Sequence, residues 1–182
     1  HAWNCHYRTL MHPDQIVMDF DPDPSVNFKI VVKACLEMKK TLEKLKLKSF
    51  VKVSGGKGIH IHIPVEPIYT WDKLKAFSKA LADEVVQRRP MEFTTTPSKD
   101  ARKGKIFLDY LRNDYGATAV APYALRAGGL SSVALPIEWS ELPKLKRSDQ
   151  FTLKKALQRI KTRKSDPSKE FLSVRQKIAI LE

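Results

Sequence analysis

Several short stretches of the chain alternate apolar and polar residues, as strands do when they bury one face. The clearest are residues 16–21, 49–53, 59–63 and 105–111, and shorter candidates are residues 118–123 and 132–135. A glycine-rich turn at residues 54–58 separates the second stretch from the third. Because two strands joined by such a turn pair with each other, we expect a β-hairpin there.

Other stretches place their apolar residues at helical spacing. Asp23 as N-cap and Pro24 at the first helical position predict a helix that runs to about Leu45. A second helix is expected from the cap at Thr70 to Arg89, which precedes Pro90. Further helices are predicted at residues 153–160 and along the stripe formed by Phe171, Val174, Ile178 and Leu181, with residues 94–104 as a loop.

Composition narrows the class of protein. The chain has 182 residues, enough for one domain with a single core. With 42% hydrophobic and 29% charged residues it resembles neither a disordered nor a fibrous protein. It contains no run of about 20 apolar residues and no secretory pattern at its start, so the expected compartment is the cytoplasm. Its two cysteines are too few for a disulfide framework or a zinc site.

The charge balance points to an anionic partner. Lys and Arg number 33 against 20 Asp and Glu, which gives a formal net charge of +13. Such a field attracts polyanions, and nucleic acid or nucleotide is the leading partner class, although ribosome-associated and membrane-surface proteins share this property. A basic cluster formed by Arg102, Lys103 and Lys105 is one candidate for contacts with a DNA backbone.

Two aspartates lie in the first predicted strand. Asp19 and Asp21 are two residues apart, so their carboxylates share a face and their Cα atoms lie roughly 6.6 Å apart. They can bind the same cation. The alternative, in which these acids only start a loop and cap a helix, explains Asp21 tolerably but not Asp19, because a carboxylate between Met18 and Phe20 must be compensated if it is buried.

Asp109 repeats this feature in the fourth predicted strand. Three acids on strand faces suit a two-metal phosphoryl-transfer site, and Mg²⁺ or Mn²⁺ suits all-carboxylate ligation better than zinc. The alternative for Asp109 taken alone is an ion pair with Arg112 or Lys105. That alternative is weaker when the three acids are considered together.

The turn at residues 54–58 has groups that can bind phosphate. Ser54 supplies a hydroxyl, Lys57 an ammonium, and the glycines unhindered N–H groups. It is not a Walker loop, which requires Gly at position 51, Ser or Thr at position 58 and a helix afterwards. His60 and His62 share the polar face of the next strand, and Arg126, beside glycines 128 and 129, can reach a phosphate.

Several of these segments together resemble a known family. Residues 19–22, 54–60 and 105–113 occur in the order and nearly the wording of the polymerase domain of bacterial LigD-type end-joining ligases, within the archaeo-eukaryotic primase superfamily. Residues 117–123 with Arg126, residues 139–142 and residues 1–4 continue the likeness. The resemblance therefore runs across nearly the whole chain.

The resemblance implies an α+β fold with an RRM-like palm, a mainly antiparallel sheet flanked by helices. It implies that Asp19, Asp21 and Asp109 bind two Mn²⁺ or Mg²⁺ ions, and that Ser54, Lys57, His60 and Arg126 hold the incoming NTP or dNTP. His1 would lie near the sugar or phosphate. A primer 3′-hydroxyl would then attack the α-phosphate in line, with positioning and charge neutralisation providing the catalysis.

The same resemblance implies a cellular setting. Residues 1–182 would form one polymerase/primase domain that lacks a block found upstream of the His-x-Trp element in relatives. Its partners would be DNA ends or gapped DNA and nucleoside triphosphates, with a Ku-like protein and attached ligase or nuclease domains as further partners and no membrane. It would work in the bacterial or archaeal cytoplasm, at the nucleoid.

Three functions follow from these observations. The first is a metal-dependent nucleotidyltransferase in double-strand-break repair by non-homologous end joining. The second is a nucleic-acid-binding module of the same fold with little or no turnover. The third is a metal-dependent nuclease that uses the same acids to activate water. The phosphate-binding turn favours a transferase over a nuclease, because only the transferase needs a triphosphate site.

Overall fold

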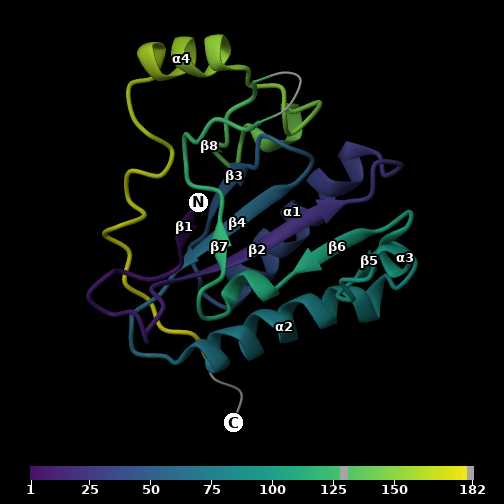
Figure 1. The fold of residues 1–182 in the computed structure, drawn as a ribbon, viewed down its shortest axis with the longest axis vertical. Helices are drawn as coiled ribbons and strands as arrows, with labels where there is room; N and C mark the ends of the chain where they lie inside the picture. The colour runs from purple at the N-terminus through teal and green to yellow at the C-terminus, as the bar shows by residue number, and fades with distance from the viewer. Residues whose placement is uncertain (128–130, 180–182) are drawn as a thin grey trace.

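The computed structural model describes residues 1–127 and 131–179, and its centre is a six-stranded sheet (Figure 1). In spatial order the strands are β5 (Phe93–Thr94), β6 (Ile106–Asp109), β2 (Gln15–Pro22), β4 (Ile59–Pro64), β3 (Phe50–Val53) and β8 (Leu135–Ile137). Neighbouring strands are antiparallel except β5 and β6. A separate two-stranded sheet pairs β1 (Ala2–Trp3) with β7 (Thr118–Ala119). The predicted hairpin and the predicted α+β architecture are confirmed.

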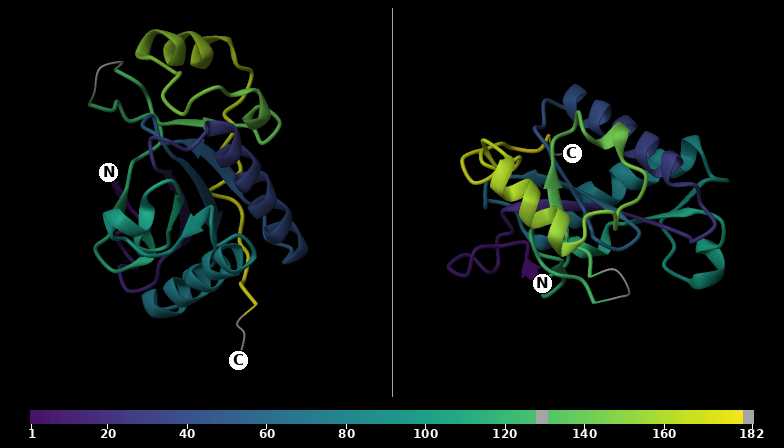
Figure 2. Two further views of the ribbon diagram at one scale, coloured as in Figure 1. Left: turned by 90° about the vertical axis from the view of Figure 1, so that its right-hand side faces the viewer. Right: turned by 90° about the horizontal axis from the view of Figure 1, so that it is seen from above.

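Two long helices, α1 (Phe28–Lys44) and α2 (Trp71–Arg88), cover one face of the sheet. Strand residues on that face, such as Ile16, Met18 and Phe20, are fully buried in a core with the apolar side chains of both helices. Figure 2 shows α1 on one side of the sheet and the chain's N-terminus on the other. Because strand side chains alternate between faces, the intervening residues of β2, among them Asp19, point away from the helices.

The ladder between β2 and β6 is extended by a side chain. β6 ends at Asp109, and the chain turns through the short 3-10 helix η1 (Leu111–Asn113). The buried Asn113 amide then takes the place of a strand backbone: its Oδ1 accepts from the Val17 N–H at 2.7 Å, and its Nδ2 donates to the Val17 carbonyl at 2.8 Å. This contact fixes the segment that follows Asp109.

The first helix begins later than its sequence predicts. α1 starts at Phe28 with Asn27 as its N-cap, so the prediction of Asp23 as the cap is wrong. Asp23 instead accepts from the N–H and hydroxyl of Ser25 and closes a turn just outside β2. The cap of α2 at Thr70 and its end at Arg89 are confirmed.

Residues 94–104 contain more structure than the predicted loop. They include the end of β5 and the short helix α3 (Lys99–Arg102), which Ser98 caps. The two shorter strand candidates are only partly strand. β7 covers two residues of the first, and in the second Ser132 and Val133 form isolated bridges before β8.

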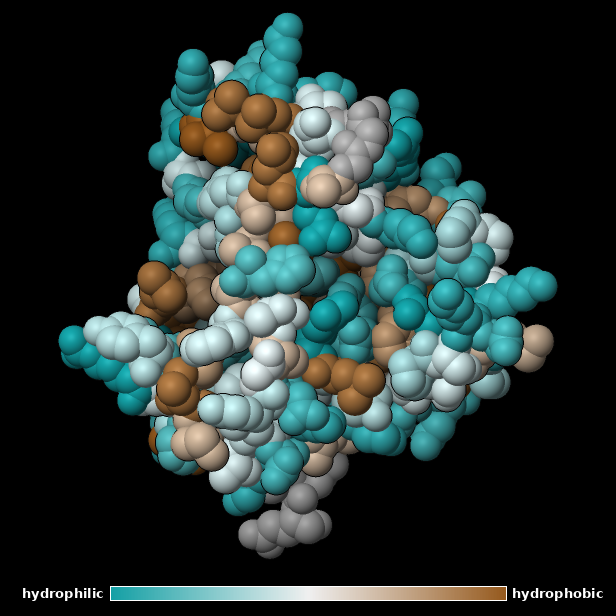
Figure 3. All heavy atoms as spheres, viewed as in Figure 1, coloured by the Kyte–Doolittle hydropathy of each residue, from teal (hydrophilic) through white to brown (hydrophobic). Residues whose placement is uncertain are grey.

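Beyond β8 lie the 3-10 helix η2 (Leu142–Lys144) and α4 (Leu153–Thr162), which was predicted from its periodicity. α4 lies at one end of the molecule, and its apolar residues Leu153, Leu157 and Ile160 are about half exposed. They contribute to the hydrophobic patch over α4 in Figure 3. Among the helices described, none has the length and apolar character of a membrane-spanning segment.

The prediction of a last helix along residues 171–181 is wrong for residues 171–179, while Leu181 lies outside the described residues. Residues 171–173 form a turn and residues 174–179 have no regular secondary structure, because the side chains of this segment bind separate elements. The Phe171 ring packs edge-on against Phe50. The Gln176 amide bonds the backbone of Lys48 and Pro64, which an apolar stripe at helical spacing does not reveal.

Replacement of Asn113 tests the side-chain extension of the ladder. We expect Asn113→Ala to lower the free energy of unfolding by about 2–5 kcal/mol, because the N–H and carbonyl of Val17 lose their partner in a buried place. The matched change Asn27→Ala, which removes only the exposed cap of α1, should cost about 1 kcal/mol. Urea titration of both variants measures the difference, and equal losses would contradict this role of Asn113.

Candidate active site

Strand register brings two of the three predicted acids face to face. Asp19 on β2 pairs directly with Asp109 on β6. Both residues are buried, with 7% and 8% of their surface exposed. Like charges directly opposite on antiparallel strands are destabilising, so this pair needs a compensating charge.

Burial and proximity alter the titration of both carboxyls. Burial, followed by the charge of Asp109, raises the pKa of Asp19 to about 7. Burial also raises the pKa of Asp109, while the nearby Arg112 opposes this shift. Perturbed carboxyls that face a cavity are typical of sites where a cation binds or a proton is exchanged.

Arg112 supplies part of the compensation. Its Nε lies 3.0 Å from Asp109 Oδ2 and 3.5 Å from Asp19 Oδ2. This buried nitrogen makes no hydrogen bond within the described part of the chain, so its contact with the acids is an ion pair only. Because of the 3.0 Å distance, the pair of Asp109 with Arg112, one of the two alternatives for Asp109, is confirmed. The pair with Lys105 is wrong, since Lys105 Nζ donates to the Pro90 carbonyl at 2.7 Å.

The third acid, Asp21, is half-buried and forms an ion pair with Arg102. Arg102 was predicted as a DNA contact, and no local pattern indicates this pairing because the two residues are 81 positions apart. Lys103 is exposed just after α3, and neither it nor Lys105 lines the cavity described below.

The carboxylates fit a hard divalent cation by donor type. Oxygen-only donors are those that Mg²⁺ and Mn²⁺ prefer, and two buried like charges favour binding a cation between them. Within residues 1–127 and 131–179, no three His, Cys, Asp or Glu side chains are already arranged around a common ligand position. Asp21 turns toward Arg102, and Arg112 stands beside the other two.

The glycine-rich turn between β3 and β4 lies directly against these acids. A Cβ on Gly58 would be 2.6 Å from the Phe20 carbonyl oxygen and 3.3 Å from Asp19 Oδ1, so only glycine allows this approach. Gly55 has a φ of +70°, which glycine adopts without strain.

Ser54 organises the interior of the turn. Its Oγ accepts from the N–H groups of Gly56 and Gly58, each at 3.2 Å. In the part of the chain that the structure describes, the N–H groups of Gly55 and Lys57 donate to no protein acceptor. These N–H groups are available to an anion.

One cavity of about 330 Å³ collects most of the predicted site residues. Its lining includes His1, Asp19, Asp21, Ser54, Lys57, His60 and Arg126, together with Arg112, which was predicted only as an alternative partner of Asp109. Asp109, opposite Asp19 on the neighbouring strand, is not part of the lining. Glycines 128 and 129, the predicted neighbours of Arg126, lie outside the described residues.

His60 and His1 both line the cavity that contains Asp19. His60 Nε2 lies 3.4 Å from Asp19 Oδ1, and burial together with the charge of Lys52 holds the pKa of His60 well below its usual range. The imidazole beside Asp19 is therefore neutral. At the edge of the same cavity, His1 Nδ1 is 3.4 Å from the Thr118 hydroxyl.

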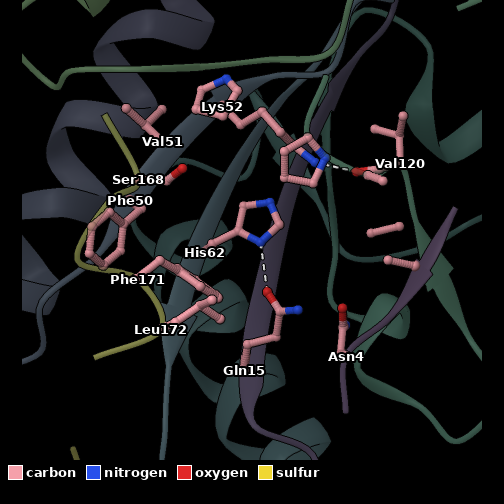
Figure 4. Close-up of a pocket in the computed structure, with 15 residues that line it drawn as sticks. Asn4, Gln15, Phe50, Val51, Lys52, His62, Val120, Ser168, Phe171 and Leu172 are labelled. Atoms are coloured by element: carbon pink, nitrogen blue, oxygen red, sulfur yellow. Dashed lines mark hydrogen bonds between the residues drawn. The ribbon is translucent and has the colours of Figure 1, made fainter. Parts of the chain in front are cut away.

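His62 points instead into a second, more apolar cavity of about 320 Å³, where it bonds Gln15 at 2.8 Å (Figure 4). Lys52 lines this cavity too and donates to the carbonyl of Val120, which lines both cavities. Burial lowers the pKa of Lys52 to about 8. Sequence reasoning missed this buried lysine, whose only signal was its place opposite His60 in the predicted hairpin.

Known proteins are similar to this chain in sequence and in fold. Residues 1–168 match the family model of the LigD primase-polymerase domain. The multifunctional non-homologous end joining protein LigD of Pseudomonas aeruginosa is 36% identical over 98% of this chain, and the bifunctional LigD of Bacillus subtilis is 34% identical over 82%. This chain spans only 21% and 24% of those two proteins.

A solved structure agrees with these matches. The polymerase domain of Mycobacterium tuberculosis Ligase D in complex with DNA superposes with a TM-score of 0.76 at 29% identity, over 82% of this chain and 52% of that one. The similarity confirms both the predicted fold class and the resemblance found in the sequence, and a divalent-metal requirement is consistent with it. The chain belongs to the LigD primase-polymerase domain family.

Proposed function

We propose that this chain is a metal-dependent nucleotidyltransferase that adds ribo- or deoxyribonucleotides to DNA 3′ ends in non-homologous end joining. One observation carries the proposal: Asp19, which is paired across the strands with the buried Asp109, lines a single cavity together with residues of the 54–58 turn and Arg126. The relatives named above are end-joining proteins, and the matching polymerase domain was solved with DNA.

Asp19, Asp21 and Asp109 are the groups that would hold two divalent ions, Mn²⁺ or Mg²⁺. Bound there, the ions would activate a hydroxyl nucleophile and stabilise the charge on the leaving pyrophosphate. The ion pairs with Arg102 and Arg112 neutralise the same carboxylates, so both guanidinium groups have to give way when a cation binds.

The remaining cavity residues act on the triphosphate. Lys57 and Arg126 neutralise its charge, and the Ser54 hydroxyl and the N–H groups of the turn donate to its oxygens. Held in this way, the α-phosphate is positioned for in-line attack by a primer 3′-hydroxyl, and pyrophosphate leaves. The neutral His60 contacts Asp19 and orients that carboxylate, while His1 lies where the sugar or phosphate would enter.

The DNA partner is supported by charge. With a net charge of +13, the chain attracts DNA ends or gapped DNA. We assign part of that contact to Arg102, Lys103 and Lys105, which lie in and after α3 beside the acids. A Ku-like protein and attached ligase or nuclease domains, acting in the bacterial cytoplasm at the nucleoid, complete the proposal.

A DNA-binding module without turnover is the second candidate. The observation that favours it is that Arg102 and Arg112 form ion pairs with all three acids, which partly neutralises the carboxylates without a metal ion. The phosphate-binding turn favours the transferase, because binding DNA alone gives no reason to place such a turn against Asp19.

Primer extension separates these two functions. On a gapped duplex with Mn²⁺ or Mg²⁺, we expect the wild-type chain to extend the primer and Asp19→Asn to lose about 100-fold or more in rate, because the carboxylate contributes several kcal/mol through the cation it holds. Separate reactions with rNTPs and dNTPs give the sugar preference. The exposed Asp72→Asn, in the first turn of α2, is the matched control and should extend normally.

Gel-shift measurements on the same proteins complete the test. DNA binding should be retained in Asp19→Asn, since the variant removes a negative charge from the site. If the wild type binds DNA but extends no primer with either ion, the chain is a binding module and the transferase proposal is wrong. Degradation of the primer in place of extension would identify a nuclease.

Two glycine variants test whether the turn must lie against Asp19. We expect Gly58→Ala to reduce primer extension at least tenfold, because its Cβ would overlap the Phe20 carbonyl and push the turn away from the acids. Gly56→Ala belongs to the same turn, but its Cβ would meet two side-chain atoms at ordinary contact distance, Ser54 Oγ at 3.5 Å and Arg126 Nη2 at 3.9 Å, and it should keep activity within about threefold. Equal activity in the two variants would show that the close approach is unimportant.

A further inference from the structure

Two buried serines hold the phosphate-binding turn from outside the hairpin. Ser148, which is 2% exposed, donates its hydroxyl to the Gly58 carbonyl, and Ser132, which is 6% exposed, donates to the Gly55 carbonyl. These serines lie 90 and 77 residues away from the glycines in sequence. Ser132 precedes β8 and Ser148 lies between η2 and α4, so the C-terminal part of the chain fastens the turn.

Ser148 also determines where the Ser54 hydroxyl can donate. A serine hydroxyl has one hydrogen, and Ser148 uses its hydrogen on the Gly58 carbonyl. In the 3.5 Å contact between the two hydroxyl oxygens, Ser148 is therefore the acceptor. Ser54 Oγ already accepts two N–H groups, so its own hydrogen is directed either to Ser148 or to a ligand in the cavity.

Ser132 connects the turn to Arg126, the second proposed phosphate contact. Its carbonyl accepts from the Arg126 N–H at 2.8 Å, while its hydroxyl binds Gly55. Packing reinforces this link, because a Cβ on Gly55 would be 2.8 Å from Arg126 Cγ and 2.9 Å from the Ala134 nitrogen. One residue thus fixes the spacing between the turn and the arginine.

We propose that Ser132 and Ser148 are positioning residues for the triphosphate, a role that rests on the proposed function. They bind the turn's carbonyls outside the cavity, which leaves the N–H groups and the Ser54 hydroxyl to the phosphate oxygens. Without Ser132, the Gly55 carbonyl loses its partner and is free to rotate, and a carbonyl oxygen turned toward the ligand repels phosphate. The Gly58 carbonyl keeps its bond from the Ser54 N–H at 3.0 Å, so loss of Ser148 instead loosens the contact that holds residues 54–58 against the segment between η2 and α4. Triphosphate binding should weaken while the acids keep their geometry.

Calorimetric titration with ribonucleoside triphosphates and Mn²⁺, in the absence of DNA, measures this directly. We expect Ser132→Ala and Ser148→Ala to raise the Kd about three- to tenfold, as expected for the loss of one hydrogen bond. Ser132→Thr, which keeps the hydroxyl, should restore binding. In primer extension the same Ala variants should raise the KM for the nucleotide with kcat within about twofold.

Ser78→Ala is the matched control. Ser78 is a fully buried serine in α2, and its hydroxyl donates to the Lys75 carbonyl at 2.9 Å within the helical layer. It should lower the melting temperature as the other two variants do and leave the Kd unchanged. If Ser148→Ala does not fold, Ser148→Cys, which keeps the side-chain size with a weaker donor, takes its place.

The outcomes separate this proposal from the proposed function. An unchanged Kd in both Ala variants, or an equal rise in Ser78→Ala, would overturn the positioning role. If the wild-type chain binds triphosphates without extending a primer, the transferase proposal is wrong, and the Kd values of the Ala variants still decide the positioning role of the two serines. A wild type that binds no triphosphate would overturn both.

Discussion

The site is built around the cross-strand pair of Asp19 and Asp109. The register between β2 and β6 places these carboxylates opposite each other inside the protein, where repulsion and loss of hydration both disfavour ionisation. The surrounding structure compensates for this with Arg112 beside both acids and with Arg102 on the neighbouring Asp21. A divalent cation would satisfy the same charges, and we regard the arginines as holding the acids in readiness for it.

The fold supplies the conditions that this pair requires. Because side chains alternate along β2, one face of the strand packs into the apolar core under the helices and the other face carries the acids. The core can therefore be closely packed while the opposite face of the sheet stays polar. Gly58 then lets the phosphate-binding turn come into contact with Asp19, and Asn113 fixes the segment that carries Arg112. Two of the proposed metal ligands, Asp19 and Asp21, thereby share one cavity with the proposed triphosphate contacts, although these residues come from distant parts of the chain.

Local patterns predicted the parts of the structure that depend on local chemistry. The alternation in β2 and β4, the cap of α2 at Thr70 and the three anomalous acids were all readable from neighbouring residues. Asn27 was missed as the cap of α1 because Asp23 and Pro24 offered an equally good local signal. The apolar stripe after residue 170 also has a helical period, but Phe171 and Gln176 bind separate elements, and no helix forms over the described part of the segment.

The unpredicted parts of the site depend on contacts between distant segments. The pairing of Arg102 with Asp21, the buried Lys52 and the two serines that hold the turn all join residues that no local motif connects. The resemblance to the LigD family identified the acids and the turn, but the groups that support them became visible only in the folded chain.

If Asp19 and Asp109 are paired to receive a cation, the pair should destabilise the fold until a cation binds, and this destabilisation should depend on pH. Asp19 has a pKa of about 7 when folded and about 3.9 when unfolded, so the folded chain keeps a proton that the unfolded chain has lost. Stability from this group is therefore lost as the pH rises between those values, and Asp19→Asn removes that loss.

The measurement is the free energy of unfolding of the wild type and Asp19→Asn from pH 4 to pH 8, with and without Mn²⁺. Without metal, the free energy of unfolding of the variant should rise relative to that of the wild type by about 1.4 kcal/mol per pH unit between about pH 4 and pH 7. Mn²⁺ should remove this difference, because it stabilises only the wild type. If the difference in free energy of unfolding between the two proteins stays constant with pH, or if Mn²⁺ stabilises both proteins equally, the acid pair is not arranged to receive a cation.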